Sequence, residues 1–420
     1  MQQMPRRALF IGIDTYDFMR PLTGPVADML ALEQMLAYHE NFTPNYACKH
    51  LLSATATDTP IDSLRISRPR MLEALRELFD TEDEVLFAFA GHGVSLPTGV
   101  YLATQDGNDS LPGIAMSDIL AMANASHAKD VLLIFDCCNA GALGDPLPFA
   151  SEAATIHFRE GLTLVAASRP AQSAREVAGN GMFTQLVIGA LEGGGKDIRG
   201  KVTSASIYGY VDQALGPWEQ RPMYKSNASR LLTVRQCEPD VSGADLQRLP
   251  ELFTTPVTPH CLDHRYEHSF EEATPECVAI FNVFKHYRDA RLLKTTIDSD
   301  LFFAAKHCTS AALTPLGKYY WELAKKGLLE SDAAFPTRRS TVPDPEAIAR
   351  LFHETYERLA PSYQYETRKE TAVPWEHVPD RNKQLMIAVA NVVLAAIFPP
   401  EDKGAFPNTS QATIRGGETE

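Results

Sequence analysis

The sequence has few cysteines, and no spacing among them repeats. Seven cysteines, an odd number, are spread over 420 residues, whereas small secreted domains that rely on disulfides are much richer in cysteine. This scarcity excludes a disulfide scaffold. We therefore expect the chain to work in the reducing cytoplasm.

The chain also lacks a long apolar run. The longest one near the end, Leu385–Phe398, has 14 residues and contains Asn391, whereas a membrane-spanning helix needs roughly 20. The first apolar run, Ala8–Ile13, is too short for the core of a secretory signal and ends at Asp14. We expect no membrane insertion, and Leu385–Phe398 is predicted to be a buried helix.

Basic residues are outnumbered by acidic ones. Lys and Arg total 39, Asp and Glu total 53, and the formal net charge is −14. Because the phosphates of a nucleic acid would be repelled, we expect no nucleic acid among the partners, and cationic partners suit the chain better. The composition is otherwise typical of a globular protein, and the length suits two or three domains.

The first 235 residues alternate short apolar runs with longer amphipathic segments. The runs are rich in β-branched or aromatic residues and nearly continuous in their apolarity, as in strands buried on both faces; they are Ala8–Ile13, Val85–Ala90, Val131–Phe135, Leu162–Ala167 and Leu231–Val234. The predicted helices between them are Pro25–His39, Arg70–Phe79, Ser117–Asn124, Phe183–Leu191 and Ser204–Leu215, with Ser117 and Ser204 as candidate N-caps. This alternation predicts an α/β domain with a largely parallel sheet covered on both faces.

The pattern changes after residue 235. Several prolines interrupt residues 236–276, which we interpret as a linker or irregular segment. Residues 277–400 are predicted to form a separate, mainly α-helical domain; its helices are Val278–Leu293, Leu316–Leu329, Pro345–Leu359, capped by Asp344, and Arg381–Phe398. The polar residues 403–420 are predicted to be disordered. The histidines and cysteine of 260–268 fit no zinc spacing, so we expect a solvated loop there and no metal site.

Two predicted strands lead directly into reactive side chains. Ala90 is followed by Gly91-His92-Gly93, and Phe135 is followed by Asp136-Cys137-Cys138. In a parallel sheet, chemistry gathers beyond the carboxyl ends of the strands. An imidazole lowers the pKa of a thiol and makes it a nucleophile, and backbone amides can stabilise an oxyanion. We therefore predict His92 as a general base and a cysteine as nucleophile, with the amides of Gly93 and Cys138 as oxyanion donors.

Several motifs, in order along residues 8–235, resemble those of the caspase and metacaspase clan. Asp136-Cys137-Cys138-Asn139-Ala140-Gly141 resembles the Asp-x-Cys-x-Ser-Gly motif of metacaspases and bacterial orthocaspases, and Ala90-Gly91-His92-Gly93 resembles their Ser-Gly-His-Gly. Further similar segments are Leu9–Tyr16, Gly24–Asp28, Ala167–Glu176 and Gly181–Thr184. The resemblance implies a caspase-like, mostly parallel six-stranded sheet flanked by helices. It divides the domain into a large-subunit-like part, 1–145, and a small-subunit-like part, 160–235.

The motif also chooses between the adjacent cysteines. It places the nucleophile two residues after Asp136, at Cys138. Since neighbouring strand residues point to opposite faces, Cys137 would then be a small buried side chain. A redox-active vicinal dithiol is the alternative.

The resemblance further implies a substrate pocket. Asp28 and Asp136 match the acids with which metacaspases bind a P1 Arg or Lys, and Ser168 stands at the matching small-subunit strand end. We therefore expect cleavage of protein substrates after Arg, with Lys second. Ala90 replaces a pocket serine of the family, and Asn139 and Ala140 replace the usual residues after the nucleophile, which bears on fine specificity.

Two forms of regulation follow from the same resemblance. Caspase-like enzymes are often cut between their two parts, and Arg159 and Arg175 are candidate cleavage sites. Many metacaspases need calcium; this chain has Asp106, Asp109 and Asp118, without the family's usual acidic pair. We therefore expect no cofactor, with calcium not strictly required.

Other functions remain open at this stage. The chain could be a catalytically silent caspase-like scaffold acting through its helical domain, although the presence of both His92 and Cys138 argues against this. A nucleotide-binding fold would need a Gly-x-Gly-x-x-Gly turn after the first strand, where Gly12-Ile13-Asp14 stands. An appended helical domain suits recruitment of an activating partner or protease, and bacterial relatives often belong to stress or anti-phage defence systems.

Overall fold

The computed structural model describes residues 6–53, 65–137, 158–167, 176–177, 180–215, 222–229, 231–297, 300–329, 344–360 and 373–397. The chain separates into two compact units, residues 1–331 and residues 332–420. The first unit holds the predicted α/β domain and a second, smaller core.

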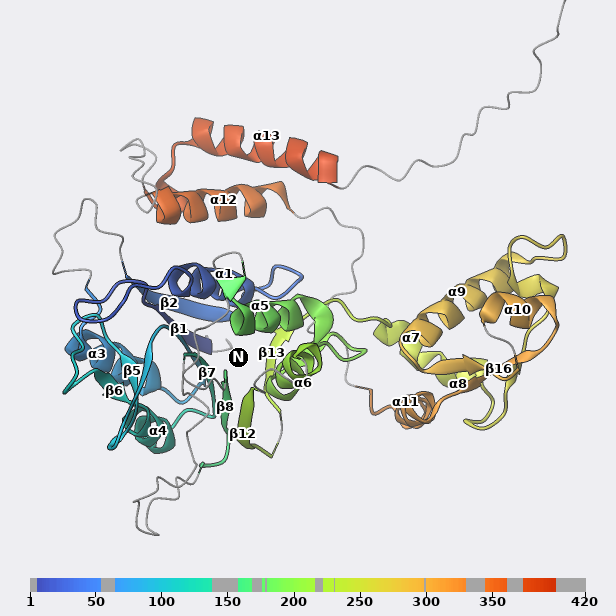
Figure 1. Cartoon of the computed structure of the whole chain (residues 1–420). Coiled ribbons are helices and arrows are strands. Elements are labelled where there is room, and N and C mark those ends of the chain that lie inside the picture. The colour runs from blue at the N-terminus through green and yellow to red at the C-terminus, as the bar shows by residue number, and fades with distance from the viewer. Residues whose placement is uncertain are drawn as a thin grey trace, which may run out of the picture. The chain divides into compact units, whose positions relative to one another are not determined.

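A six-stranded sheet forms the centre of the α/β domain (Figure 1). In spatial order its strands are β12 (Met223–Asn227), β8 (Leu162–Ala166), β7 (Asp130–Asp136), β3 (Glu84–Ala90), β1 (Arg6–Gly12) and β2 (Tyr46–Leu52). All neighbouring pairs are parallel except β12 and β8. The sheet confirms the predicted caspase-like, mainly parallel six-stranded architecture.

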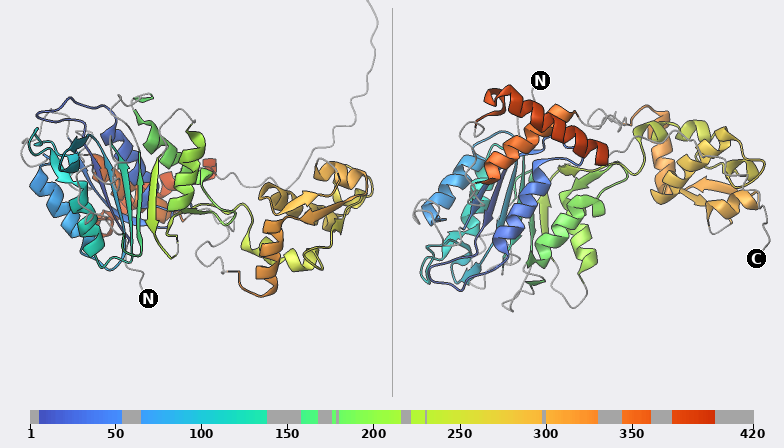
Figure 2. Two further views of the ribbon diagram at one scale, coloured as in Figure 1. Left: turned by 60° about the horizontal axis from the view of Figure 1, so that its bottom comes forward. Right: turned by 90° about the horizontal axis from the view of Figure 1, so that it is seen from above.

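The central strands are buried on both faces, as their continuous apolarity predicts. On β3, Phe87 and Phe89 belong to one core while Leu86 and Ala88 belong to the other. Helices α3 (Arg68–Phe79) and α4 (Met116–Ala125) contribute to the core on the Phe87 face of the sheet. Helices α1 (Pro25–Ala37), α5 (Met182–Gly189) and α6 (Ser204–Ala214) contribute to the core on the Leu86 face. Figure 2 shows the sheet between these two helical layers.

Some elements differ from the sequence-based expectation. Edge strand β2 was not predicted because Lys49 and His50 break its apolar pattern. Leu231–Val234 falls partly in β13 (Thr233–Gln236), which pairs with β11 (Lys201–Thr203) outside the main sheet. The remaining short strands are β4 (Gly93–Leu96), β5 (Gly99–Ala103), β6 (Gly113–Ala115), β9 (Glu176–Val177) and β10 (Asn180–Gly181).

Helix caps also differ from the predicted ones. The N-cap of α4 is Ala115, the residue before the first helical residue, Met116, and not Ser117. Thr203, not Ser204, caps α6, and its hydroxyl forms a capping box with Ser206. A π-helical turn, η2 (Ala190–Gly194), continues α5.

Residues 241–329 form a second core within the first unit. Large apolar side chains from across this range meet there, including Phe253, Phe281, Phe284, Tyr287 and Trp321. Its helices and strands are α7 (Gly243–Gln247), α8 (Leu249–Leu252), β14 (His260–Cys261), η3 (His264–Tyr266), α9 (Pro275–Asp289), β15 (Leu293–Thr295), α10 (Leu301–Lys306), β16 (Ser310–Leu313) and α11 (Pro315–Lys325). The strands form an antiparallel sheet in the order β14-β16-β15.

This second core corrects the boundaries expected around residues 236–276. That segment was expected to be a linker, but Leu246, Leu249 and Phe253 are buried in the core. Its prolines do not break the structure because Pro250 and Pro275 lie in the first turns of α8 and α9, where proline is tolerated.

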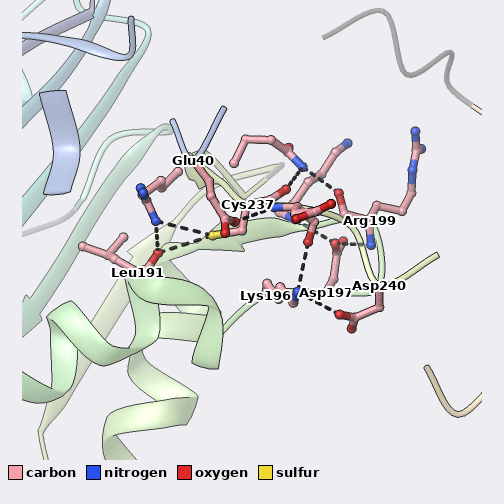
Figure 3. Close-up of polar contacts among 11 residues, drawn as sticks. Glu40, Leu191, Lys196, Asp197, Arg199, Cys237 and Asp240 are labelled. Atoms are coloured by element: carbon pink, nitrogen blue, oxygen red, sulfur yellow. Dashed lines mark hydrogen bonds and ion pairs between the residues drawn. The ribbon is translucent and has the colours of Figure 1, made fainter. Parts of the chain in front are cut away.

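A cluster of polar contacts surrounds the segment in which the chain passes from the α/β domain to the core of residues 241–329 (Figure 3). Lys196 Nζ lies 2.8 Å from Asp240 Oδ1 and donates to the carbonyl of Glu238 at 2.9 Å. The Glu238 amide donates to Glu40 Oε2 at 2.6 Å. The Asp240 amide donates to the carbonyl of Ile198, whose side chain packs on the second core.

The second unit is a helical hairpin of α12 (Pro345–Leu359) and α13 (Asp380–Ile397), with the short turn η6 (Trp375–His377) between them. Asp344 caps α12 as predicted, accepting a hydrogen bond from the Glu346 amide. The buried residues between the helices are few, and Leu385 and Val392 on α13 are 66% and 71% exposed. Leu385–Phe398 is therefore not the fully buried helix that was expected. None of the helices in the described ranges is long and apolar enough to cross a bilayer.

Candidate active site

The strand register brings the two reactive segments to the same edge of the sheet. Ala90 at the end of β3 pairs with Asp136 at the end of β7. The Gly91 amide donates to the Asp136 carbonyl at 3.3 Å, so the chain stays in contact just beyond the strands. His92 and Cys138 each follow a member of this pair by two residues. In the sequence, both reactive residues thus follow the paired ends of neighbouring strands.

His92 is held in one tautomer by a backbone carbonyl. Its Nε2 lies 2.8 Å from the carbonyl oxygen of Arg20. Because a carbonyl can only accept, Nε2 carries the proton, and the neutral ring has its lone pair on Nδ1. Burial lowers the pKa of His92 below its ordinary value, and the positive charge of Arg20 acts in the same direction. The ring is therefore neutral near pH 7 and ready to accept a proton at Nδ1.

Tyr16 fixes the backbone and the ring of this histidine. The His92 amide donates to the Tyr16 hydroxyl at 2.8 Å, and the two ring centroids are 4.8 Å apart. Burial raises the pKa of Tyr16, so its hydroxyl keeps its proton. The close approach requires glycine at position 91, where a Cβ would lie 2.6 Å from the Tyr16 hydroxyl.

Asp28 and Asp136 lie together against the first turn of α5. Asp28 Oδ2 accepts a hydrogen bond from the Gly181 amide at 2.8 Å. Asp136 Oδ2 accepts from the Thr184 hydroxyl at 2.7 Å and from the Thr184 amide at 3.3 Å. Both carboxylates are buried, 2% and 7% exposed. The structure thus brings together the two acids that the sequence predicts as the pocket.

Within this like-charged pair, the pKa of Asp28 is raised. Burial raises the pKa of Asp28 to about 6, the negative charge of Asp136 acts in the same direction, and hydrogen bonds from Gly181 and Gln185 oppose it. The second oxygen of Asp28, Oδ1, is buried and has no hydrogen-bond partner among the described residues. A cationic group could supply the missing donor.

Of the two adjacent cysteines, the described residues include only Cys137. Its side chain is 3% exposed and lies in the core on the α3 and α4 face of the sheet. Cys138, like the predicted sites Ser168 and Arg175, lies outside the described residues. Burial also raises the pKa of the Cys237 thiol. Neither Cys137 nor Cys237 is therefore suited to act as an exposed thiolate.

Arg159, a candidate cleavage site, is tied down by its surroundings. Its guanidinium donates to the carbonyls of Ala123, Ala128 and Glu160 at 3.0, 2.6 and 2.7 Å. Its amide donates to Asn124 Oδ1 at 2.9 Å. In this arrangement the Arg159 side chain anchors the chain ahead of β8 and is not available to enter a protease pocket.

Gly93 and the acids considered for calcium lie in and after the small antiparallel sheet of β4, β5 and β6. Gly93 begins β4 and pairs with Leu102 of β5. Asp106, one of the acids considered for calcium, accepts hydrogen bonds from the Arg68 amide and the Thr104 hydroxyl. In the part of the chain that the structure describes, no three His, Cys, Asp or Glu side chains are grouped so that they could hold a metal ion.

His260 has a structural role rather than the solvated position expected for it. Its Nδ1 lies 2.7 Å from the Leu252 carbonyl oxygen and its Nε2 lies 2.8 Å from the Tyr266 hydroxyl. The ring also packs edge-on against Phe284 in the second core. His260 therefore links β14 to α8 and η3.

Sequence reasoning missed several contributors to this site, among them Arg20, Tyr16 and Thr184. The Arg20 carbonyl and the Thr184 amide are backbone groups, which carry no residue-specific signal. Tyr16 and Thr184 lie inside segments that resemble the family, but only the fold shows that they contact His92 and Asp136.

Comparison with known proteins gives a match to the family model of the caspase domain, peptidase C14, over residues 5–233, more than half of the chain. Among solved structures, the chain is similar to the crystal structure of caspase-1 from Spodoptera frugiperda, with 14% identity and a TM-score of 0.38 over 56% of this chain and 91% of that one. It is also similar to a structure of pro-Sf-caspase-1, with 14% identity and a TM-score of 0.36 over 55% and 94%. No curated protein sequence matches the chain.

Proposed function

The chain belongs to the caspase family of peptidases, and from this premise we propose that it is a cysteine endopeptidase that cleaves proteins after Arg, with Lys second. The observation that carries the proposal is the neutral His92, which has its lone pair on Nδ1 and follows β3 where that strand is in register with the cysteine-bearing end of β7.

The proposed reaction uses this chain's residues in two stages. His92 Nδ1 takes the proton of the Cys138 thiol, and the thiolate attacks the carbonyl carbon of the scissile peptide bond. The amides of Gly93 and Cys138 donate to the resulting oxyanion. His92 then gives its proton to the departing amine, which leaves a thioester on Cys138. A water molecule, deprotonated by His92, hydrolyses the thioester and releases the acid and the free thiol.

The proposed specificity rests on the two buried acids. A P1 guanidinium or ammonium would pair with Asp28 and Asp136 and would supply the donor that Asp28 Oδ1 lacks. Ser168, two residues after the last residue of β8 in the sequence, is proposed as a further substrate contact. A P1 Asp would place a third carboxylate beside two others, which is unfavourable.

A panel of fluorogenic peptides that differ only at P1 tests this proposal. We expect turnover with Arg, less with Lys, and none with Asp or with citrulline, the neutral analogue of Arg. Cys138→Ala and His92→Ala should be inactive, and their unfolding temperatures should match that of the wild type. Faster cleavage of the Asp peptide than of the Arg peptide contradicts the specificity. Complete inertness of the wild type favours the silent scaffold instead.

The proposal includes no required cofactor and gives the C-terminal helices a recruiting role. If calcium is not required, EGTA leaves the Arg-peptide rate unchanged; abolition of activity by EGTA contradicts this part. We further propose that an activating protein partner acts through the C-terminal helices, which the exposed Leu385 and Val392 of α13 support. A stress or anti-phage defence role in the cytoplasm would agree with such activation.

A further inference from the structure

Gly181, the N-cap residue of α5, and Thr184, in its first turn, supply donors for the two pocket acids. Asp28 belongs to α1 and Asp136 ends β7, both in the large-subunit-like part, whereas Gly181 and Thr184 belong to the small-subunit-like part. Polar contacts between the halves at this point include the Gly181 amide to Asp28 and the Thr184 amide and hydroxyl to Asp136. The acids therefore depend on α5 for their arrangement.

The backbone at Gly181, just before α5, lies directly against both carboxylates. A Cβ on Gly181 would lie 2.5 Å from Asp136 Oδ2 and 3.0 Å from Asp28 Oδ2. Two like charges buried this closely need donors to remain ionised. The Thr184 hydroxyl donates such a hydrogen bond to Asp136 Oδ2 at 2.7 Å.

Thr184 itself is 1% exposed, so its hydroxyl is not a solvent-facing group. Its position explains why a hydroxyl-bearing residue stands there. A side chain of the same shape without the hydroxyl would fill the space but would remove the 2.7 Å hydrogen bond to Asp136 Oδ2 and keep the longer, 3.3 Å amide contact. The hydroxyl thus contributes a charge-assisted hydrogen bond that packing alone does not replace.

We propose that Thr184 is a positioning residue of the substrate pocket: its hydroxyl orients the Asp136 carboxylate for a P1 Arg or Lys. The inference rests on the proposed function, because it assumes that the acids receive the substrate cation. Thr184 has no part in the chemistry of Cys138 and His92, so it acts on substrate binding and not on the nucleophile.

The test compares Thr184→Val, which keeps the shape and removes the hydroxyl, with Thr184→Ser, which keeps the hydroxyl. For an Arg peptide we expect Thr184→Val to raise KM roughly tenfold, the effect of losing one hydrogen bond to a charged group, with kcat changed less than about twofold. Thr184→Ser should restore KM to within about twofold of the wild-type value. Alkylation of Cys138 by iodoacetamide should proceed at the wild-type rate in both variants.

Each outcome has one interpretation. An unchanged KM in Thr184→Val, while the wild type cleaves Arg peptides, overturns the role of Thr184 and leaves the proposed function intact. A raised KM that Thr184→Ser does not restore also overturns it, since packing would then be the cause. If the wild type does not cleave Arg peptides, the proposed function fails first. KM does not depend on the active fraction, so partial misfolding of a variant does not obscure the result, and Thr184→Ala replaces Thr184→Val if the latter does not fold.

Discussion

At the scale of single residues, a backbone carbonyl, and not another ionisable side chain, sets the tautomer of the neutral His92 ring. The Arg20 carbonyl binds Nε2, and burial lowers the pKa of the ring. A carbonyl, unlike a carboxylate, carries no full negative charge that would stabilise the protonated ring. The base is therefore ready at neutral pH without a third acidic group.

The contact between Tyr16 and His92 leads to a prediction for Tyr16→Phe. The substitution keeps the ring beside His92 but leaves the His92 amide without its acceptor, which costs about 1–3 kcal/mol when the group is buried. We expect a lower unfolding temperature and a kcat for the Arg peptide reduced roughly tenfold by misplacement of the base. Urea unfolding and steady-state kinetics measure both. Wild-type values for both quantities would mean that the hydroxyl has no such role.

The raised pKa of Asp28 gives a prediction for stability and activity together. The folded chain retains the Asp28 proton up to about pH 6, whereas an ordinary value is 3.8. The unfolded chain releases that proton first, so this group lowers the free energy of unfolding as pH rises from about 4 to above 6. Asp28→Asn cannot ionise and should be more stable than the wild type at pH 8, by on the order of 2 kcal/mol, but not at pH 4.

The same Asp28→Asn variant should raise KM for the Arg peptide, because the pocket loses a charge. Stability gained with binding lost is the expected result for a functional residue held under strain. Denaturant unfolding at both pH values, with the Arg peptide assayed at pH 8, is the measurement. A variant that is less stable at pH 8 and binds the peptide normally would identify Asp28 as structural.

Functional side chains could be predicted from the sequence, but their backbone hydrogen-bond partners could not. His92, Asp28 and Asp136 could be predicted because each stands in a short motif with a chemical reason. The Arg20 carbonyl could not, since any residue at position 20 would present the same oxygen. Thr184 could have been noticed as a polar side chain in an apolar helix, but its partner is 48 positions away in the chain.

At the scale of elements, continuous apolarity predicted the central strands and failed at the edges. Strands β3 and β7 are buried on both faces, and their sequences show it. Strands β2 and β12 lie at the two edges of the sheet, where Lys49, His50 and Lys225 are accommodated, so their patterns are mixed. Register, which brings the two strand ends together, depends on pairing across the sheet and is not encoded by either strand alone.

The segment between β7 and β8 gives a prediction about processing. Residues 138–157 contain no Lys or Arg, and Arg159 is anchored by three carbonyls. An enzyme that cuts after basic residues should therefore leave this segment intact during turnover. Mass spectrometry of the active protein should find no new terminus between residues 138 and 160.

A variant with a basic residue in that segment is the matched control. Ala153→Arg should be cut after position 153 by the wild-type enzyme, which shows that the segment is reachable when a basic residue is present. Cleavage of the wild type after Asp145 would contradict the proposed specificity. Cleavage after Arg159 would contradict the anchoring role of that side chain.

At the scale of the whole molecule, the chain holds separate cores. The two cores of the α/β domain and the core of residues 241–329 lie in one compact unit, and the α12–α13 hairpin forms another. The single helical domain expected over 277–400 is thus divided. Helices α9, α10 and α11 pack with residues 241–271, whereas α12 and α13 pack with each other. Helical periodicity identifies helices but not their partners.

This division predicts that the chain can be shortened after Ser331. Removal of residues 332–420 takes away one small core and leaves the other three intact. We expect the shortened chain to unfold within about 2 °C of the wild type and to cleave Arg peptides at the basal rate. Calorimetry and the peptide assay test this. Loss of the cooperative transition would show that the hairpin is required for folding of the first unit.

The central claim, that Cys138 is the nucleophile and His92 its base, is tested most directly by trapping the enzyme with a peptidyl-arginine chloromethyl ketone. Mass spectrometry of the intact protein and of its peptides then locates the adduct. The account predicts a single adduct on Cys138 in the wild type, none in Cys138→Ala, and a much slower reaction in His92→Ala. An adduct on Cys137, or equal labelling of Cys138→Ala, would contradict it.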